Sequence, residues 1–500
     1  KMPDETIKYL HSIANEEGTA AAILADDGEK FGVWPGTHKW VYEDGYLEKL
    51  LTKLEESAEW IEFMTFAQYV DEVPPLGRIY LPTASYSEMM EWSLPTESGK
   101  KLDHITEEIR RAGKTEEYSQ FFKGGFFRNF LVKYPEANNM HKRMLQVSQR
   151  LQTLKKGKSL IGERERDSRL REAQKELFMG QCNCAYWHGV FGGLYLNYLR
   201  HAIYEHLLKA DSLLDKYSRA KEDYAEITVT DFDRDGHDEV VLVNNLLNLY
   251  FAPHYGGALF ELDYKPKNFN LLNTLARREE KYHQKISHAA AQGAAGVSSI
   301  HDIVKVKEPG LEKMLIYDRQ LRWSLLDRLL DPAADLESFS AQRAASVGNF
   351  TAQPYEFMPQ RRGNEVSLVM RRQDAVGGVP VKLEKTVSLC AKQSIVNITY
   401  ELTNLGGTAC SCRFGPEFNL SLLAGRAPDR YYEIPGVKLD DAALASRGEV
   451  SSVGALKIVD EWKGFVVLLE FDRPADLWRF PIETVSQSES GFERTYQGSV

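Results

Sequence analysis

Three carboxylates stand close together near the start of the chain. Residues 26–36 read Asp-Asp-Gly-Glu-Lys-Phe-Gly-Val-Trp-Pro-Gly, and an apolar run at 20–25 precedes them. The run predicts a short buried strand, and the glycines and proline after it predict a loop. In α/β barrels, catalytic groups are displayed where a core strand opens into a loop. Paired carboxylates suit cleavage of a glycosidic bond, where one acid protonates the leaving oxygen and another group stabilises an oxocarbenium-like centre.

The other side chains of this loop fit a sugar site as well. Trp34 offers a flat apolar face of the kind on which sugars stack, and Lys30 adds a counter-charge to Asp26, Asp27 and Glu29. The same residues also fit an Asp-Gly turn with solvated charges, which is a common structure. Residue chemistry alone leaves both interpretations open.

A second block with chemical potential lies at residues 181–193, which read Gln-Cys-Asn-Cys-Ala-Tyr-Trp-His-Gly-Val-Phe-Gly-Gly. Trp187 could stack on a sugar ring, and His188 could hydrogen-bond to a hydroxyl group. A single histidine more often has a structural role, which is the alternative for His188. The two glycines at its end indicate tight packing or close approach of a ligand.

The two blocks together resemble the family 57 glycoside hydrolases. Residues 26–37 are similar to the fourth conserved region of that family, and residues 181–193 are similar to the fifth. The closest group is that of the α-amylases and 4-α-glucanotransferases. The resemblance implies a retaining enzyme that acts on α-1,4-linked maltooligosaccharides and starch. A non-catalytic glucan-binding relative and a glucan branching enzyme are the alternatives.

The resemblance also implies roles for single residues. In the family, a Glu attacks the anomeric carbon and an Asp acts first as acid and then as base; the motif places that Asp at Asp27. The residues expected to bind the sugar are Glu29, Trp34, Cys184, Trp187 and His188. Cys184 departs from the group's pattern, which has Asp there. A thiol with a pKa of about 8.5 is mostly neutral and a weaker hydrogen-bond partner, so the resemblance leaves the substrate preference open, although Asp27 is intact.

Two of the family's motifs are missing from the sequence. The first region, His-Gln-Pro, and the third region, which carries the nucleophilic Glu, occur nowhere in the 500 residues. The chain is therefore interpreted as the C-terminal part of a longer enzyme. Because a retaining mechanism needs two carboxyl groups about 5–5.5 Å apart, we expect this chain by itself to be inactive.

Composition limits the class of protein. A hydrophobic content of 43% in 500 residues predicts two or three domains, and a net charge of -10 argues against a nucleic-acid binder. No apolar run is long enough for a membrane span, and the first residues lack the apolar core of a signal peptide. Five cysteines, an odd number, predict free thiols in a reducing compartment and a cytoplasmic location.

The element pattern predicts a multidomain α/β plus β protein. Helices expected at 4–17 and 46–54 alternate with strands at 20–25 and 61–66, as in a parallel barrel. Residues 1–101 are therefore expected to be the C-terminal part of a catalytic (β/α) barrel. Downstream, Ser85 is expected to cap a helix that begins at 86.

The remainder divides into a helical and a β-rich part. Residues 102–222 are expected to form a helical subdomain that completes the active site, with helices at 142–154, 164–177 and 194–208. Residues 223–500 are expected to form an antiparallel β-sandwich. Its clearest predicted strands are 227–230, 240–243, 382–389, 395–402 and 465–471. Residues 288–299, rich in Ala, Gly and Ser, predict a mobile loop.

An acidic turn at the start of the β-rich part resembles the opening of a calcium loop. Asp231, Asp233 and Asp235 alternate and are followed by Gly236. The full EF-hand pattern needs a Glu six residues after the Gly, where Leu242 stands, and strands rather than helices are expected on both sides. A tight Asp/Gly turn and a bound calcium are the two interpretations. The proposed chemistry requires no cofactor, and the expected partner is an α-glucan, with no nucleic acid and no membrane.

Overall fold

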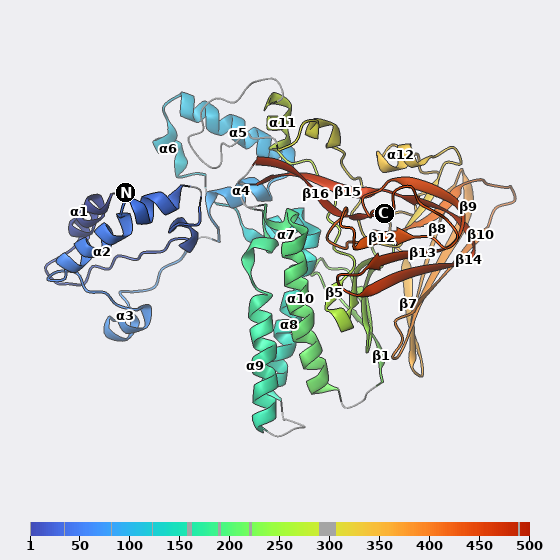
Figure 1. Ribbon diagram of the computed structural model, residues 1–500, viewed down its shortest axis with the longest axis horizontal. Coiled ribbons are helices and arrows are strands. Elements are labelled where there is room, and N and C mark those ends of the chain that lie inside the picture. Colours follow the sequence, from blue (N-terminus) through green and yellow to red (C-terminus); the bar gives the residue numbers. More distant parts are fainter. Residues whose placement is uncertain are drawn as a thin grey trace. The chain divides into compact units, whose positions relative to one another are not determined.

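The computed structural model describes residues 2–34, 36–81, 83–122, 124–157, 163–188, 192–219, 223–289, 307–488 and 491–500. The chain forms two compact units, residues 1–82 and residues 83–500, each with its own architecture (Figure 1). The predicted divisions after residues 101 and 222 stay predictions.

The described part of residues 1–82 is helical. Its helices are α1 (Pro3–Ile13), α2 (Tyr46–Glu56) and α3 (Phe66–Glu72). It also contains a 3₁₀ turn, η1 (Gly28–Lys30), and a short π-helix, η2 (Lys39–Glu43). Helix α1 packs against α2, where Lys53 Nζ lies 2.6 Å from a carboxylate oxygen of Asp4. The helices predicted at 4–17 and 46–54 are confirmed, although α1 ends four residues early.

The strands predicted at 20–25 and 61–66 are wrong. Residues 20–25 and 61–65 have no regular secondary structure, and Phe66 begins α3; neither segment makes a strand pairing within the described part of residues 1–82. Their apolar side chains remain exposed: Ile23 by 72%, Leu24 by 84% and Phe63 by 70%. An apolar run becomes a strand only when a neighbour supplies hydrogen bonds and covers a face. Composition shows the preference for a strand but does not supply that neighbour.

Residues 83–500 begin with helices. In chain order these are α4 (Ser87–Ser93), α5 (Thr96–Arg111), α6 (Thr115–Ser119), α7 (Phe127–Lys133), α8 (Pro135–Lys156), α9 (Glu163–Met179) and α10 (Asn197–Ser218). The last three lie side by side (Figure 1). They confirm the three predicted helices, except that α10 starts after a short turn, η4 (Gly193–Tyr195).

Ser85 does not cap α4. The residue at the N-cap position is Tyr86, and its side chain makes no capping hydrogen bond. The backbone N–H of Ser85 donates to the Gly125 carbonyl oxygen instead. The helix begins at Ser87, one residue later than predicted, so Ser85 stands before the N-cap position.

From residue 225 the described chain is mainly antiparallel sheet. Its strands are β1 (Ala225–Thr230), β2 (Glu239–Asn244), β3 (Leu247–Ala252), β4 (Ala258–Tyr264), β5 (Phe269–Asn270), β6 (Leu326–Leu330), β7 (Glu356–Arg362), β8 (Glu365–Val376), β9 (Val379–Cys390), β10 (Val396–Asn404), β11 (Arg413–Glu417), β12 (Arg430–Glu433), β13 (Gly448–Asp460), β14 (Phe465–Arg479), β15 (Pro481–Ser488) and β16 (Gly491–Ser499). All five predicted strands of this part are confirmed. Short helices α11 (His283–Ala289) and α12 (Leu336–Ser340) interrupt the strands.

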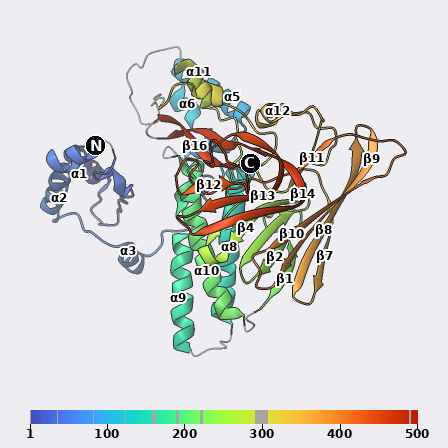
Figure 2. The same ribbon diagram turned by 45° about the vertical axis from the view of Figure 1, so that its right-hand side comes forward.

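The described strands form five sheets, and four of them contribute buried side chains to one apolar core. Strands β1 to β5 pair in chain order, and β7 to β10 form a second sheet that packs against β1 and β2 (Figure 2). Leu242 and Phe251 from the first sheet meet Leu368 and Val387 from the second, all fully buried. Three smaller sheets, β6 with β11, β12 to β14, and β15 with β16, complete this part.

A buried ion network joins the helices to the first sheet. The guanidinium of Arg143 on α8 lies 2.9 Å from Asp211 on α10 and 3.0 Å from Glu261 on β4. Its side chain is 2% exposed. Arg150 binds Asp211 as well, at 2.5 Å. Paired charges of this kind fix one orientation of α8 and α10 on the sheet.

Two expectations about segments remain. The loop predicted at 288–299 lies outside the described residues from 290 onward. Within the described ranges, none of the helices combines the length and the apolar character that crossing a membrane requires.

Candidate active site

Asp27 lies where an extended segment turns into the 3₁₀ turn η1. Its backbone is extended, with φ of -73° and ψ of 128°, and its side chain is 62% exposed. The glycine that follows lets the chain turn at once, and the Lys30 N–H donates to the Asp27 carbonyl oxygen at 3.2 Å. A carboxylate held at a turn and open to solvent can meet a ligand. Glu29, inside the turn, is also exposed.

Lys30 gathers the charged and aromatic groups of this loop. Its ammonium forms an ion pair with Asp26, lies 3.8 Å from Asp27 and stands 5.3 Å from the ring centre of Trp34. The hydrogen bond from Lys30 lowers the pKa of Asp26, and the same bond raises the pKa of Lys30. The loop therefore brings Asp27, Lys30 and Trp34 together, as the sequence predicted.

Trp187 and His188 follow a second 3₁₀ turn, η3 (Asn183–Tyr186). The Tyr186 hydroxyl donates to the Gly180 carbonyl oxygen at 2.6 Å and anchors this turn. The Leu194 N–H then donates to the Trp187 carbonyl oxygen at 2.9 Å. These bonds fix the position of the two predicted sugar-binding residues.

Aromatic side chains surround both residues. Trp187 packs on Trp92 with ring centres 4.9 Å apart and meets the edge of Tyr86 at 5.7 Å. His188 is only 3% exposed and lies between Trp92 and Tyr282. Its Nε2 is 3.3 Å from the Tyr282 hydroxyl. Trp187 is half-buried and is therefore more accessible to a ligand than His188. His188 packs inside the aromatic cluster and contacts Tyr282.

A buried carboxylate underlies this aromatic cluster. Glu280 accepts hydrogen bonds from the hydroxyls of Tyr134 at 2.5 Å and Tyr195 at 2.6 Å. Burial opposes its charge, but the Lys133 ammonium and the two hydroxyls outweigh burial and lower the pKa of Glu280. Because Tyr195 also packs edge-on against His188, Glu280 fixes one wall of the cluster.

Cys184 is exposed on η3, where its thiol donates to the side-chain oxygen of Asn183 at 3.5 Å. The structure thus brings Trp187 and His188 together in residues 83–500, and Asp27 and Trp34 together in residues 1–82. One site shared by both groups stays a prediction.

The sequence did not single out Trp92, Tyr282 or Glu280. Trp92 is on α4, 95 positions before Trp187, and Glu280 stands in a run of charged residues that reads as a solvated surface. No periodic pattern links such distant positions. The local sequence signal for this cluster was the pair of aromatic residues Tyr86, just before α4, and Trp92, near its end.

The acidic turn predicted as a calcium candidate lies between β1 and β2. Asp231 and Asp233 both accept the Asp235 N–H, each at 3.1 Å. The buried side chain of Glu239 turns toward them, and its Oε2 accepts the Phe232 N–H at 2.7 Å. Burial raises the pKa of Glu239 to about 8 and that of Asp233 to about 6. Carboxyl oxygens of Asp231, Asp233 and Glu239 lie within 4.8 Å of one another.

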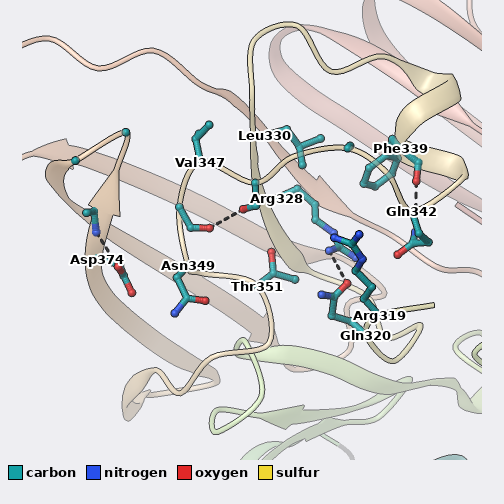
Figure 3. A pocket seen from close by; sticks show the side chains of 16 residues that line it. Arg319, Gln320, Arg328, Leu330, Phe339, Gln342, Val347, Asn349, Thr351 and Asp374 are labelled. Atoms are coloured by element: carbon teal, nitrogen blue, oxygen red, sulfur yellow. Dashed lines mark hydrogen bonds between the residues drawn. The ribbon is translucent and has the colours of Figure 1, made fainter. Parts of the chain in front are cut away.

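A cavity of about 530 Å³ opens among β6, α12 and the hairpin of β8 and β9 (Figure 3). Polar side chains line much of it, among them Arg319, Asn349 and Asp374, with Phe339 as an apolar wall. Arg328 donates to Gln320 at 3.0 Å on one side. None of the predicted site residues lines this cavity.

Comparison with known proteins extends over nearly the whole chain. A model described as "Glycosyl hydrolase family 57" matches residues 1–82. Models described as "Alpha-amylase/4-alpha-glucanotransferase", middle domain and C-terminal, match residues 125–214 and 231–500.

Individual relatives agree with these models. The "Alpha-amylase 1" of Dictyoglomus thermophilum is 39% identical over 99% of this chain and 68% of its own length. The "4-alpha-glucanotransferase" of Thermococcus kodakarensis is 36% identical over the same shares. The crystal structure of the 4-alpha-glucanotransferase from Thermococcus litoralis matches with a TM-score of 0.73 at 34% identity, over 99% of this chain and 67% of that one.

The chain thus spans about two thirds of the length of these relatives. The resemblance carried by residues 26–37 and 181–193 is confirmed, because identities of 34–39% extend far beyond those two blocks. On this basis the chain belongs to glycosyl hydrolase family 57, in its group of alpha-amylases and 4-alpha-glucanotransferases.

Proposed function

We propose that the protein acts on α-1,4-linked glucans such as maltooligosaccharides and starch, as a 4-α-glucanotransferase or an α-amylase. The observation that carries this proposal is the 34–39% identity over 99% of the chain to relatives with those two names. Asp27 is exposed just before the turn η1, and Trp34 lies in the same loop. This arrangement supports glycosidic-bond chemistry on a sugar substrate.

Asp27 is proposed as the acid that protonates the leaving glycosidic oxygen and then as the base that activates the acceptor. Its position supports this role, because a proton donor must reach the substrate and Asp27 is the more exposed of the two neighbouring aspartates. The residues proposed to bind the sugar are Glu29, Trp34, Cys184, Trp187 and His188. Stacking on Trp187 is the best supported of these contacts, since Trp92 and Tyr86 hold its ring in place.

Two finer points of architecture belong to this proposal. The antiparallel strands after residue 225 are proposed to form a β-sandwich, since two of their sheets share one apolar core. Residues 1–101 are proposed to belong to a barrel-type catalytic part, because the family 57 model matches residues 1–82. A cytoplasmic location is proposed from the odd number of cysteines, five, which is not typical of a disulfide framework.

Product analysis tests the function. The protein as its gene encodes it is incubated with maltoheptaose, and the products are separated by chain length by chromatography. A glucanotransferase gives both shorter and longer chains with no net gain in reducing ends, whereas an α-amylase gives only shorter chains with a matching gain.

Two other outcomes would overturn the proposal. New α-1,6 branches on amylose would identify a branching enzyme. Binding of maltoheptaose without any turnover would identify a glucan-binding relative.

A further inference from the structure

The turn between β1 and β2 carries oxygen ligands at the spacing of a calcium loop. Counting Asp231 as the first position, Asp233 and Asp235 are the third and fifth, and Gly236 is the sixth. Calcium loops use positions one, three and five, a glycine at six and a side chain at nine. Glu239 is the ninth residue. Position twelve, where an EF-hand loop has Glu, is Leu242.

We propose that Asp231, Asp233, Asp235 and Glu239 bind a calcium ion. This inference does not depend on the proposed glucan activity, because none of these residues has a role in it. Candidate ligand atoms of Asp231, Asp233 and Glu239 lie within 4.8 Å of one another, and so do those of Asp235, Glu239 and His254. Glu239 belongs to both groups and therefore marks the centre of the site.

Glu239 supplies an observation independent of the acidic turn. It is the first residue of β2 and is 1% exposed. Its Oε2 accepts the N–H groups of Phe232 and Asp233, but its Oε1 has no hydrogen-bond partner. A buried carboxylate oxygen without a hydrogen bond is costly, and its polar neighbour, His254 Nδ1, stays 3.5 Å away. An ion placed among these carboxylates would satisfy that oxygen and relieve the repulsion between the side chains.

The turn is also shaped for this task. Gly236 has a backbone φ of 94°, an angle that residues other than glycine rarely adopt. This conformation turns the chain back toward β2. The Gly236 N–H donates to Asp231 Oδ2 at 3.3 Å, and the His237 N–H donates to Asp235 Oδ1 at 2.8 Å. These bonds hold each carboxylate on the inner side of the turn before any ion binds.

His254 approaches the site from the connection between β3 and β4. Val240 pairs with Phe251 across the sheet, so Glu239 lies near the end of β3, two residues before His254. The imidazole Nε2 is 3.3 Å from Asp235, and Nδ1 is 3.5 Å from Glu239 Oε1. Calcium takes oxygen ligands, whereas zinc favours imidazole. Since four of the five groups are carboxylates, we assign calcium and place His254 as a neighbour that orients Asp235 and Glu239.

The ion would stiffen the junction between the helices and the first sheet. The amide of Asn138 on α8 donates to the Asp233 carbonyl oxygen at 2.9 Å. The turn is therefore fixed at one end by α8 and at the other by β2. A calcium ion bound to its side chains would connect both elements, and because it binds the folded form it would raise thermal stability.

Calorimetric titration of calcium chloride into the metal-free protein tests the assignment. We expect one site with a Kd below about 1 mM. Glu239→Gln and Asp231→Asn should each weaken binding by about tenfold or more. Asp238→Asn is the matched control, because Asp238 is an exposed carboxylate of the same turn that belongs to neither ligand group. Its Kd should stay within about twofold of wild type.

Thermal unfolding gives a second readout. Calcium at about a hundred times its Kd should raise the Tm of wild type and of Asp238→Asn by a few degrees. The Tm of Asp231→Asn should rise by at most about half as much, because its calcium binding is at least about tenfold weaker. That variant removes only an exposed charge and should fold. Absence of calcium binding at 1 mM, or an equal loss in Asp238→Asn, would overturn the proposal. The proposal would also be overturned if the protein bound zinc more tightly than calcium and His254→Asn abolished the zinc binding.

Discussion

At the scale of single residues, Lys30 gives the two neighbouring aspartates of the loop different environments. It pairs with Asp26, whose side chain is 36% exposed, while Asp27 at 3.8 Å keeps 62% of its side chain exposed. The hydrogen bond lowers the pKa of Asp26 and so holds that carboxylate in its charged form. Asp27 is consequently the more accessible of these two aspartates, and its role in the active site stays a prediction.

Cys184 offers a residue-scale test of the second block. Because it is exposed and replaces an aspartate at a position that resembles a sugar-binding one, bound maltoheptaose should slow its alkylation by iodoacetamide by about tenfold at saturation. Peptide mass spectrometry gives the rates for each thiol. Cys390 on β9 is the internal reference and should react at the same rate with and without sugar. An unchanged rate at Cys184 would place it outside the site.

The sequence identified the residues that belong to local motifs and missed their distant partners. Asp27, Trp34 and Trp187 were proposed because each stands in a block with a chemical pattern. Tyr282 was not proposed, because it stands 94 positions after His188 in the sequence and contacts it only in the folded chain. Glu239 stood beside the acidic turn but was passed over, because only its burial shows that its side chain points inward.

At the scale of elements, periodicity predicted helices well and strands only where partners exist. The helices at 142–154 and 164–177 contain their own hydrogen bonds, so the local pattern is sufficient. A strand depends on a neighbour elsewhere in the chain. Strands 240–243 and 382–389 have neighbours and form, whereas the equally apolar segment 20–25 has none among the described residues and stays open.

The junction of helices and sheet depends on Arg143. Replacing Arg143 by Ala would leave Asp211 and Glu261 buried with one cation fewer, and loss of one partner of a buried pair costs about 3–5 kcal/mol. The free energy of unfolding from urea titration should fall by about that amount. Arg111→Ala on α5, which removes an exposed pair with Glu107, should cost about 0–1 kcal/mol. Equal losses in both variants would contradict the role of the network.

At the scale of the whole molecule, buried ion pairs tie separate parts of the β-rich region together. Asp318 lies within 2.6 Å of Arg277 and also pairs with Arg322, which in turn binds Glu417 at 2.9 Å. Burial opposes the charge of Asp318, but the two guanidiniums outweigh burial and lower the pKa of Asp318 well below its usual value.

This network predicts the response to acid. A carboxyl group whose pKa is lower in the folded than in the unfolded state stabilises the protein above its unfolded pKa, and that stabilisation is lost as the pH falls. The Tm should therefore stay level near neutral pH and fall below a pH of about 4–5. Asp318→Asn should reduce the slope, whereas Asp472→Asn, at a residue that is 83% exposed, should not. A Tm that stays level down to pH 3 would contradict this.

The change of secondary structure along the chain was partly predictable. The change from helical to β pattern near residue 223 lies between the end of α10 and the start of β1, because each pattern reflects local burial. The pairing of sheets could not be predicted, since Leu242 and Val387 lie 145 positions apart in one core. The family was predictable from residues 26–37 and 181–193, because these motifs consist of consecutive residues and can be recognised without the fold.

Turnover of maltoheptaose by the Asp27→Asn variant tests the proposed function most directly. The protein as its gene encodes it is compared with Asp27→Asn and with Asp71→Asn, which changes an exposed aspartate on α3. Circular dichroism confirms that all three are folded. Because loss of a general acid typically costs a hundredfold or more, Asp27→Asn should lower turnover by at least about a hundredfold, and Asp71→Asn should leave it unchanged. Near-normal turnover by a folded Asp27→Asn variant would contradict the assignment of this loop to the active site.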